Sequence, residues 1–564
     1  MRRILLGLLC VLSLAALAGC TVSPGNLLFD ITGEEDLPRQ IRALGQLALN
    51  PLYPSPQTAA VSAVANAGVN PFGINTFLEQ EVEEWKREES LRLISEAGFR
   101  WIRQEFPWED IEIHGKDDFE DRRHEPYRSA WDKYDNIVSL AGQYDIEIIA
   151  RLSNPPAWTR LDGDERGTYA PPDDLSDWGD YVEAVVARYR GEIRYYQLWN
   201  EPNIYPEWGE QPVNPEAYVQ LLCEGYARAK AVDPDVVILT GALAPTVAQD
   251  PGPGPALGLS EFIFLQRMYD AGAAACFDVL AVNDYMLWSG PTDRRMRPLN
   301  INFSRPMYVR DIMVKNGDAA KPVWISEMNS NAVPNDPNIQ GWGAFGQVTL
   351  EQQAEYAVRA YERVLEEWPW VGVVNFWFFK RASDAEMNQV WYYFRLVEPD
   401  FTPLPVYDAL RDYATGVIPT LYSGVHQEDH WALYYDGAWE RIDDPSASLG
   451  AYQRALSPGA TLQWMFEGTS LILVPGPGQA EIEVQIDDDE PERILLKGQP
   501  VRLLRQATSG RHTVTVTALT VDVDVDEIVV GRAWNPSLWV LAGAAVVVVL
   551  LLWMAAPRRR RRRR

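Results

Sequence analysis

The stretch YYQLWNEPN, residues 195–203, has the pattern of a buried β-strand that ends in polar residues and a proline. Seven further apolar stretches share this pattern, at residues 69–77, 99–106, 146–153, 236–243, 277–285, 322–329 and 372–379. Successive stretches start 30 to 50 residues apart, which leaves room for a helix after each strand. Eight such units predict an α/β protein with a closed (β/α)8 TIM barrel over residues 69–417. An open doubly wound sheet is the alternative, because periodicity alone does not close a barrel.

The pattern changes after the barrel. From residue 418, short β-rich stretches such as SLILVPG (470–476), EIEVQID (481–487) and RHTVTVTAL (511–519) are separated by glycine, proline and aspartate turns. Short strands at this spacing predict a smaller all-β sandwich over residues 418–533. The segment loosely resembles jelly-roll carbohydrate-binding modules, and this resemblance implies that it binds carbohydrate.

The N-terminus has the features of an export signal. Arg2 and Arg3 precede an apolar run that ends in Leu-Ala-Gly-Cys at residues 17–20, which resembles a bacterial lipobox. We therefore expect a signal peptide over residues 1–20, of the lipoprotein type with lipidation of Cys20; an ordinary secretory signal is the alternative. Residues 21–68, rich in proline and alanine, are expected to form a stalk with one short helix near Leu37 to Leu49.

The C-terminus predicts a membrane anchor. Residues 536–556 carry no charge and are followed by a polyarginine tail within residues 557–564. An apolar stretch of this length is typical of a transmembrane helix, and the positive-inside rule places the arginines in the cytoplasm. The body is accordingly expected to be extracellular, at the cell membrane, with membrane lipid as a partner.

Composition excludes several classes of function. The net charge is −28 although nine arginines lie at the two ends, so the central body is strongly acidic and a nucleic-acid partner is not expected. The chain has no HExxH or CxxC motif, and we expect neither a metal nor another cofactor. In an oxidising compartment Cys223 and Cys276 are candidates for a disulfide, with apolar packing as the alternative.

Two glutamates stand where chemistry is expected in a barrel. Glu201 ends one predicted strand and Glu327 ends another, and functional residues of parallel barrels collect at the carboxyl ends of strands. Cleavage of a glycosidic bond needs such a pair, because one carboxylic acid protonates the leaving oxygen while an ionised carboxylate attacks the sugar or directs water.

WNEPN at 199–203 and ISEMNS at 325–330 resemble motifs of retaining β-glycosidases of glycoside hydrolase clan A, including the β-xylosidase and α-iduronidase family and cellulase-like families. The resemblance covers residues 69–416 and implies an O-glycosyl hydrolase acting on oligo- or polysaccharides. It implies Glu201 as acid/base and Glu327 as nucleophile. It also implies substrate-binding positions around them, at Asn200, Arg103, Tyr285 and Trp377.

The chain also departs from these relatives. Glu105 stands where histidine is common, and Asn283-Asp284-Tyr285 replaces a frequent His-x-Tyr. For Arg103, a structural salt bridge with Glu105 or Glu327 is the alternative to a role in catalysis. For the whole protein, the alternatives are a non-catalytic glycan-binding or adhesion protein and a membrane-tethered scaffold.

Overall fold

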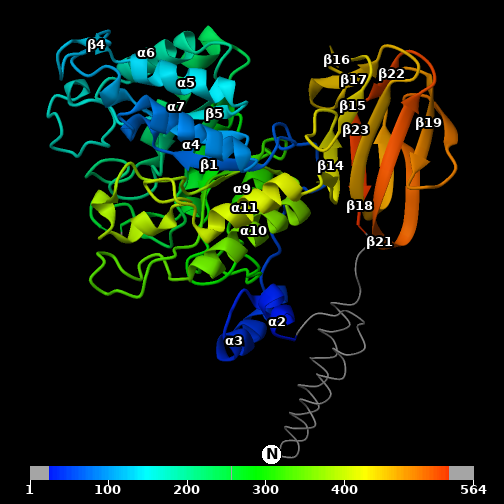
Figure 1. Ribbon diagram of the computed structural model, residues 1–564, viewed down its shortest axis with the longest axis horizontal. Helices are drawn as coiled ribbons and strands as arrows, with labels where there is room; N and C mark the ends of the chain where they lie inside the picture. The colour runs from blue at the N-terminus through cyan, green and yellow to red at the C-terminus, as the bar shows by residue number, and fades with distance from the viewer. Residues whose placement is uncertain (1–23, 256, 533–564) are drawn as a thin grey trace, which may run out of the picture.

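The computed structural model describes residues 24–255 and 257–532. Figure 1 shows a mixed α/β domain, a β-rich domain beside it, and two N-terminal helices against the first domain. The predicted signal peptide (1–20), the predicted transmembrane helix (536–556) and the arginine tail (557–564) lie outside the described residues. Within the described part of the chain, no helix is both long and apolar enough to cross a membrane.

The first domain is an eight-stranded parallel TIM-like barrel, as expected. Its strands are β1 (Phe72–Thr76), β2 (Trp101–Pro107), β5 (Glu147–Ser153), β6 (Tyr195–Asn200), β7 (Val237–Ala242), β10 (Leu280–Asn283), β11 (Val323–Met328) and β12 (Val371–Phe376). They pair in the order β10-β11-β12-β1-β2-β5-β6-β7. Isolated parallel bridges Leu239–Val279 and Leu243–Val282 join β7 to β10 and close the ring.

One helix follows each barrel strand. These helices are α4 (Glu84–Glu96), α5 (Asp132–Gln143), α6 (Leu175–Arg188), α7 (Pro215–Val232), α8 (Glu261–Asp270), α9 (Pro306–Lys315), α10 (Leu350–Glu367) and α11 (Pro405–Gly416). Local sequence fixes where two of these helices begin. At α7 the side chain of Asn214 accepts a hydrogen bond from the Ala217 amide, and Pro215 is the first helical residue. At α10 Thr349 and Gln352 form a capping box.

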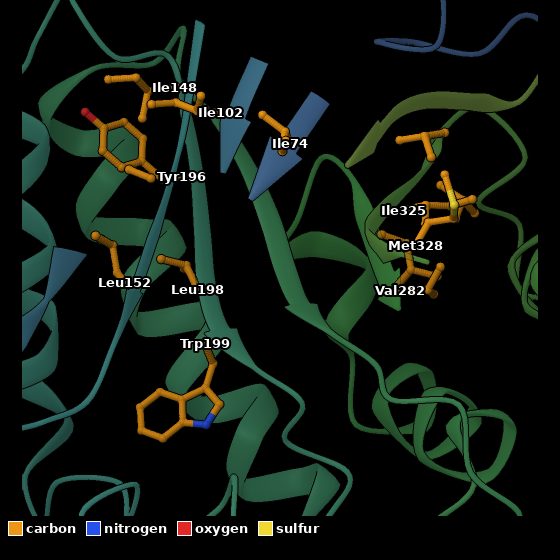
Figure 2. Close-up of a cluster of buried hydrophobic side chains, with 14 of the residues drawn as sticks. Ile74, Ile102, Ile148, Leu152, Tyr196, Leu198, Trp199, Val282, Ile325 and Met328 are labelled. Carbon is orange, nitrogen blue, oxygen red and sulfur yellow. The ribbon is translucent and has the colours of Figure 1, made fainter. Parts of the chain in front are cut away.

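Alternation along the strands separates an apolar face from a polar one. Ile102, Ile148 and Leu198 belong to the main core, part of which is shown in Figure 2. Full burial of each such side chain contributes about 1.5–3 kcal/mol. The neighbouring residues Arg103 and Gln197 instead contact each other inside the barrel, where Arg103 Nε donates to Gln197 Oε1 (2.5 Å). Because successive side chains of a strand point to opposite faces, the same strands supply both the apolar core and a polar barrel interior.

The barrel interior is apolar at the amino ends of the strands. Trp101, Tyr195 and Trp324 pack against one another there, with ring centroids 4.9–5.3 Å apart. They form a cluster separate from the main core. We call this end of the barrel the floor and the opposite end, at the carboxyl ends of the strands, the mouth.

The expected stalk contains helices that pack on the barrel. These are α2 (Pro24–Thr32) and α3 (Leu37–Leu47). Glu34 pairs with Arg295 (2.7 Å) in the loop after β10, and the Phe29 ring stacks on Tyr356 of α10 at 5.5 Å. These contacts pack this part of the segment against the barrel. The local composition does not reveal them, because the partner residues lie far away in the sequence.

The second domain is β-rich, as expected. Its strands are β13 (Thr420–Leu421), β14 (Gly424–Gln427), β15 (Tyr434–Asp436), β16 (Trp439–Asp443), β17 (Ala451–Ala455), β18 (Thr461–Val474), β19 (Ala480–Ile486), β20 (Glu492–Leu496), β21 (Val501–Ala518), β22 (Val523–Val525) and β23 (Glu527–Gly531). An eight-stranded sheet is built around β18 and β21, and β16, β17 and β22 form a three-stranded sheet. Both sheets contribute to one core, with Leu462 and Val514 from the larger sheet and Val523 and Val525 from the smaller.

This domain touches the floor of the barrel. The Trp431 amide donates to the Gly68 carbonyl (2.6 Å), just before β1, and the Trp431 ring meets Phe72 edge-on at 6.3 Å. A disulfide joins Cys223 of α7 to Cys276 before β10, so the pairing alternative holds for these two cysteines.

Candidate active site

The two predicted catalytic glutamates lie at the mouth. Glu327 is the fifth residue of β11, and Glu201 directly follows β6. Glu201 adopts a left-handed backbone (φ +39°), and its amide donates to the Ala242 carbonyl at the end of β7 (2.9 Å). The strand ends therefore bring to one rim two carboxyls that are 126 residues apart in sequence.

Both oxygens of Glu327 accept hydrogen bonds. Arg103 Nη1 donates to Oε1 (2.9 Å) and the Tyr285 hydroxyl donates to Oε2 (2.5 Å). The side chains of Arg103 and Glu327 are only 2% and 6% exposed. Burial and the nearby Glu327 charge raise the pKa of Tyr285 well above its usual value, so the phenol keeps its proton as a donor. This arrangement suits an ionised carboxylate.

Glu201 is in a different environment. Asn283 Nδ2 donates to Glu201 Oε1 (2.8 Å). Burial, followed by the negative charges of Glu327 and Glu207, raises the pKa of Glu201 well above its usual value. The two carboxyls of the site therefore have different surroundings: Glu327 accepts hydrogen bonds on both oxygens, whereas burial and nearby charge favour the protonated form of Glu201.

Arg103 connects the site to the polar interior of the barrel. Besides Glu327, its guanidinium donates to Gln197 Oε1 (2.5 Å), Asn75 Oδ1 (2.9 Å) and Asn200 Oδ1 (2.8 Å). Gln197 Nε2 in turn donates to Ser326 Oγ (3.0 Å), the residue before Glu327. A planar guanidinium with this many acceptors has one orientation, which fixes the position of Glu327.

The remaining predicted residues lie at the same end. The Trp377 amide donates to the Met328 carbonyl (3.1 Å), which places the tryptophan just after β12 beside β11. Its half-buried ring packs edge-on against Phe77 at 5.6 Å. The structure therefore brings Arg103, Asn200, Tyr285 and Trp377 to the mouth together with the two glutamates.

Sequence reasoning missed three residues of this site: Asn283, Glu207 and Arg151. Asn283 contacts Glu201, and its position at a strand end was a usable signal. Glu207 accepts from Asn200 Nδ2 (3.2 Å), and Arg151 of β5 pairs with Glu105. The period-2 pattern of β5 places Arg151 inside the barrel, whereas the position of Glu207 depends on the loop conformation after β6.

Metal-binding side chains do not gather in the described ranges: residues 24–255 and 257–532 contain no group of three or more His, Cys, Asp or Glu able to hold a metal ion.

The known proteins to which this chain is similar include glycoside hydrolases. No family model matches the chain. A curated 6-phospho-beta-glucosidase from Clostridium longisporum is 27% identical over 115 residues, which span 20% of this chain and 23% of that protein. The chain resembles clan A retaining glycosidases.

Two solved structures illustrate the likeness. A family 39 glycoside hydrolase from Bacteroides cellulosilyticus WH2 is 17% identical, with a TM-score of 0.47 and coverage of 81% of this chain and 82% of that one. A GH39 beta-xylosidase from Caulobacter crescentus is 14% identical, with a TM-score of 0.44 and coverage of 82% and 98%. Both sequence identities are below 25% and both TM-scores are below 0.5.

Proposed function

We propose that the protein is a retaining glycosidase that hydrolyses O-glycosidic bonds of oligo- or polysaccharides. This proposal rests on the difference between the environments of the two glutamates. Glu327 has two donors on its carboxylate, and Glu201 lies where burial and the charge of Glu327 favour the protonated form. Double displacement requires these two states at the outset.

The reaction follows from these states. An oxygen of Glu327 attacks the anomeric carbon while Glu201 transfers its proton to the leaving oxygen, which breaks the glycosidic bond and forms a glycosyl ester on Glu327. Glu201, now ionised, takes a proton from water, whose oxygen attacks the same carbon and releases Glu327. Two inversions give net retention, and both glutamates return to their starting states.

Neighbouring residues support these steps. Arg103 and Tyr285 hold the Glu327 carboxylate in position, and Asn200 binds a hydroxyl of the reacting sugar. The half-buried Trp377 provides an aromatic surface beneath the sugar ring. Asn283 orients the Glu201 carboxyl by its hydrogen bond (2.8 Å).

The stereochemical outcome tests the proposal. Proton NMR of an aryl glycoside mixed with the enzyme shows which anomer forms first, before mutarotation. We expect the anomer of the substrate. Glu201→Ala should lose least activity on substrates with good leaving groups, and added azide should yield a glycosyl azide of retained configuration. Glu210→Ala, exposed on the same loop, is the matched control.

Inverted product would overturn the mechanism. Absence of turnover with every aryl glycoside, together with binding of glycans, would instead favour the non-catalytic glycan-binding alternative.

We also propose that the catalytic domain is extracellular and membrane-anchored, and that the β-rich domain binds carbohydrate. The proposal is supported by the apolar stretch at 536–556, the arginines after it and the lipobox-like Cys20. Protease added to intact cells should remove the barrel and leave a small C-terminal fragment in the membrane. A barrel that is protected until lysis would contradict this topology.

A further inference from the structure

The two arginines beside the catalytic candidates are each paired with a glutamate. Arg103 pairs with Glu327 (2.9 Å), and Arg151 pairs with Glu105; all four side chains are less than 15% exposed. Glu201 and Glu207 add two further carboxyls to the same group, since the charge of Glu207 acts on both Glu201 and Arg151. Carboxyls therefore outnumber guanidiniums four to two.

Three further basic side chains in the loops after the barrel strands are also paired: Lys380 with Glu81, Arg381 with Glu386 (2.9 Å), and Arg160 with Asp164 (2.5 Å). A phosphate or carboxylate on a substrate would compete for each of these cations with the carboxylate already paired to it.

Glu207 is held where a sugar can reach it. The Trp199 indole donates to the Glu207 carbonyl (2.8 Å), and the buried Trp208 packs against Trp199 at 5.4 Å, which fixes the backbone on both sides of the carboxyl. Oε2 accepts from Asn200 Nδ2 (3.2 Å), and within the described chain Oε1 makes no hydrogen bond. Glu207 thus has one oxygen that positions Asn200 and one that is open to a ligand.

The surroundings of Glu207 suit a hydroxyl group. Burial raises its pKa to about 7, with the charges of Glu327 and Glu105 acting in the same direction and Arg151 and Asn200 against it. Near neutral pH the carboxyl therefore both donates and accepts. Arg151, beside it, adds donors that are not used by Glu105. A sugar hydroxyl needs one donor and one acceptor, and this pair supplies both.

We propose that the mouth selects neutral glycosides, with Glu207 and Arg151 binding sugar hydroxyls next to the one that Asn200 binds, and that it rejects glycosides bearing a carboxylate or phosphate. This inference rests on the proposed glycosidase function and names its substrate class. Selection works by both contact and competition: hydroxyls complete the open hydrogen bonds of Glu207 and Arg151, whereas an added anion meets arginines already paired with Glu327 and Glu105.

Paired substrates test the selection. The kcat/KM of the full-length enzyme is compared for 4-nitrophenyl β-glucoside, β-galactoside and β-xyloside against the β-glucuronide and the 6-phospho-β-glucoside. We expect the best neutral substrate to exceed both anionic ones by at least about 100-fold. An anionic substrate turned over as well as the best neutral one would overturn the inference and leave the glycosidase proposal standing.

Binding decides the question independently of turnover. Calorimetry with the corresponding non-hydrolysable thioglycosides should show the same order, neutral above anionic, even if no substrate is cleaved. Equal or tighter binding of the glucuronide or 6-phosphate analogue would contradict the inference. Failure of catalysis alone would count against the glycosidase proposal only.

Variants of Glu207 separate substrate selection from a structural role. Glu207→Lys should raise kcat/KM for the 6-phospho-β-glucoside or the glucuronide relative to the neutral substrate by at least about 10-fold. Glu207→Gln, which keeps an acceptor for Asn200, should raise KM for neutral substrates more than it lowers kcat. Glu210→Lys and Glu210→Gln, on the exposed part of the same loop, should change neither ratio. An equal loss on all substrates would assign Glu207 to structure and overturn its part of the inference.

Discussion

The two ends of the barrel bury very different side chains. At the mouth, Arg103 and Glu327 are almost inaccessible and form an ion pair (2.9 Å), and further hydrogen bonds join Arg103 to Asn200 and Tyr285 to Glu327. At the floor the barrel is closed by Trp101, Tyr195 and Trp324, and the β-rich domain adds His426 and His430 beneath it, ring centroids 4.9 Å apart. One strand thus passes from an apolar end to a charged end within a few residues.

Burial acts on both ends in the same sense and has different consequences. It disfavours the charged form of any group, so it raises the pKa of Glu201 and lowers the pKa of His426 to about 4. At the mouth this produces a carboxylic acid ready to donate a proton. At the floor it produces neutral histidines that pack against an apolar domain junction. In the proposed mechanism, burial serves catalysis at the mouth because Arg103 and Tyr285 hold the neighbouring Glu327 carboxylate in place.

The largest effect is expected at the mouth. Glu327→Gln keeps one acceptor oxygen, so either Arg103 or Tyr285 loses its partner, and it removes the nucleophile; kcat/KM should therefore fall at least about 10⁴-fold. Kinetics on an activated aryl glycoside and thermal unfolding of the same sample measure the effect. A variant within about 10-fold of the wild type would remove Glu327 from the reaction.

Glu201 should give the next largest effect, and it depends on pH. Because burial and the charge of Glu327 raise its pKa, Glu201 stays protonated to a higher pH than an ordinary glutamate, and kcat/KM for a poor leaving group should fall as the pH rises through that pKa. Glu201→Gln should lower kcat/KM by about 10²–10⁴-fold and abolish this alkaline limb. pH–rate profiles of wild type, Glu201→Gln and the control Glu210→Gln check this; a limb that survives in Glu201→Gln would belong to another group.

Much of this division between the ends could be predicted from the sequence. Strand-length apolar stretches that recur after helices predicted all eight barrel strands, and strand ends predicted where Glu201 and Glu327 lie. Arg103 and Tyr285 came from the family resemblance, because nothing local distinguishes them from other buried polar residues.

Other features depend on tertiary contacts that a one-dimensional pattern does not encode. Glu207 contacts Asn200 only because the loop after β6 turns back, held by Trp199 and Trp208. The floor junction brings Gly68 and Trp431 together across more than 360 residues. The segment that holds helices α2 and α3 packs near Arg295 and Tyr356, and nothing in its local sequence names these partners.

The pKa of His426 at the floor is shifted in the opposite direction to the pKa of Glu201. His426 has a pKa of about 4 in the folded protein, below the ordinary value of about 6.5. Its contribution to stability is therefore complete above pH 6.5 and is lost as the pH falls toward 4, by about 2–3 kcal/mol.

The unfolding free energy of wild type minus that of His426→Gln, measured from pH 7 to pH 4, isolates this contribution. His124→Gln, an exposed histidine, is the control and should show no pH-dependent difference of this size. An NMR titration of His426 with a midpoint near 6.5 would contradict the burial described for the floor.

Trp431 provides the smallest effect and tests whether the two ends are independent. Its half-buried ring meets Phe72 edge-on, and its amide holds Gly68 (2.6 Å), so Trp431→Ala removes apolar contact between the β-rich domain and the floor. The loss should be about 2 kcal/mol, below the roughly 3–5 kcal/mol of a fully buried tryptophan. Because the floor lies opposite the mouth, kcat/KM should stay within about twofold of the wild type at temperatures where the variant is folded.

Trp439→Ala, which loses its contact with Tyr435 (4.9 Å) inside the β-rich domain, is the matched control for a tryptophan lost away from the junction. If Trp431→Ala lowers kcat/KM tenfold or more while Trp439→Ala does not, the floor and the mouth are coupled, and the polar interior around Arg103 and Gln197 is the route through which a shift at the floor would reach Glu327.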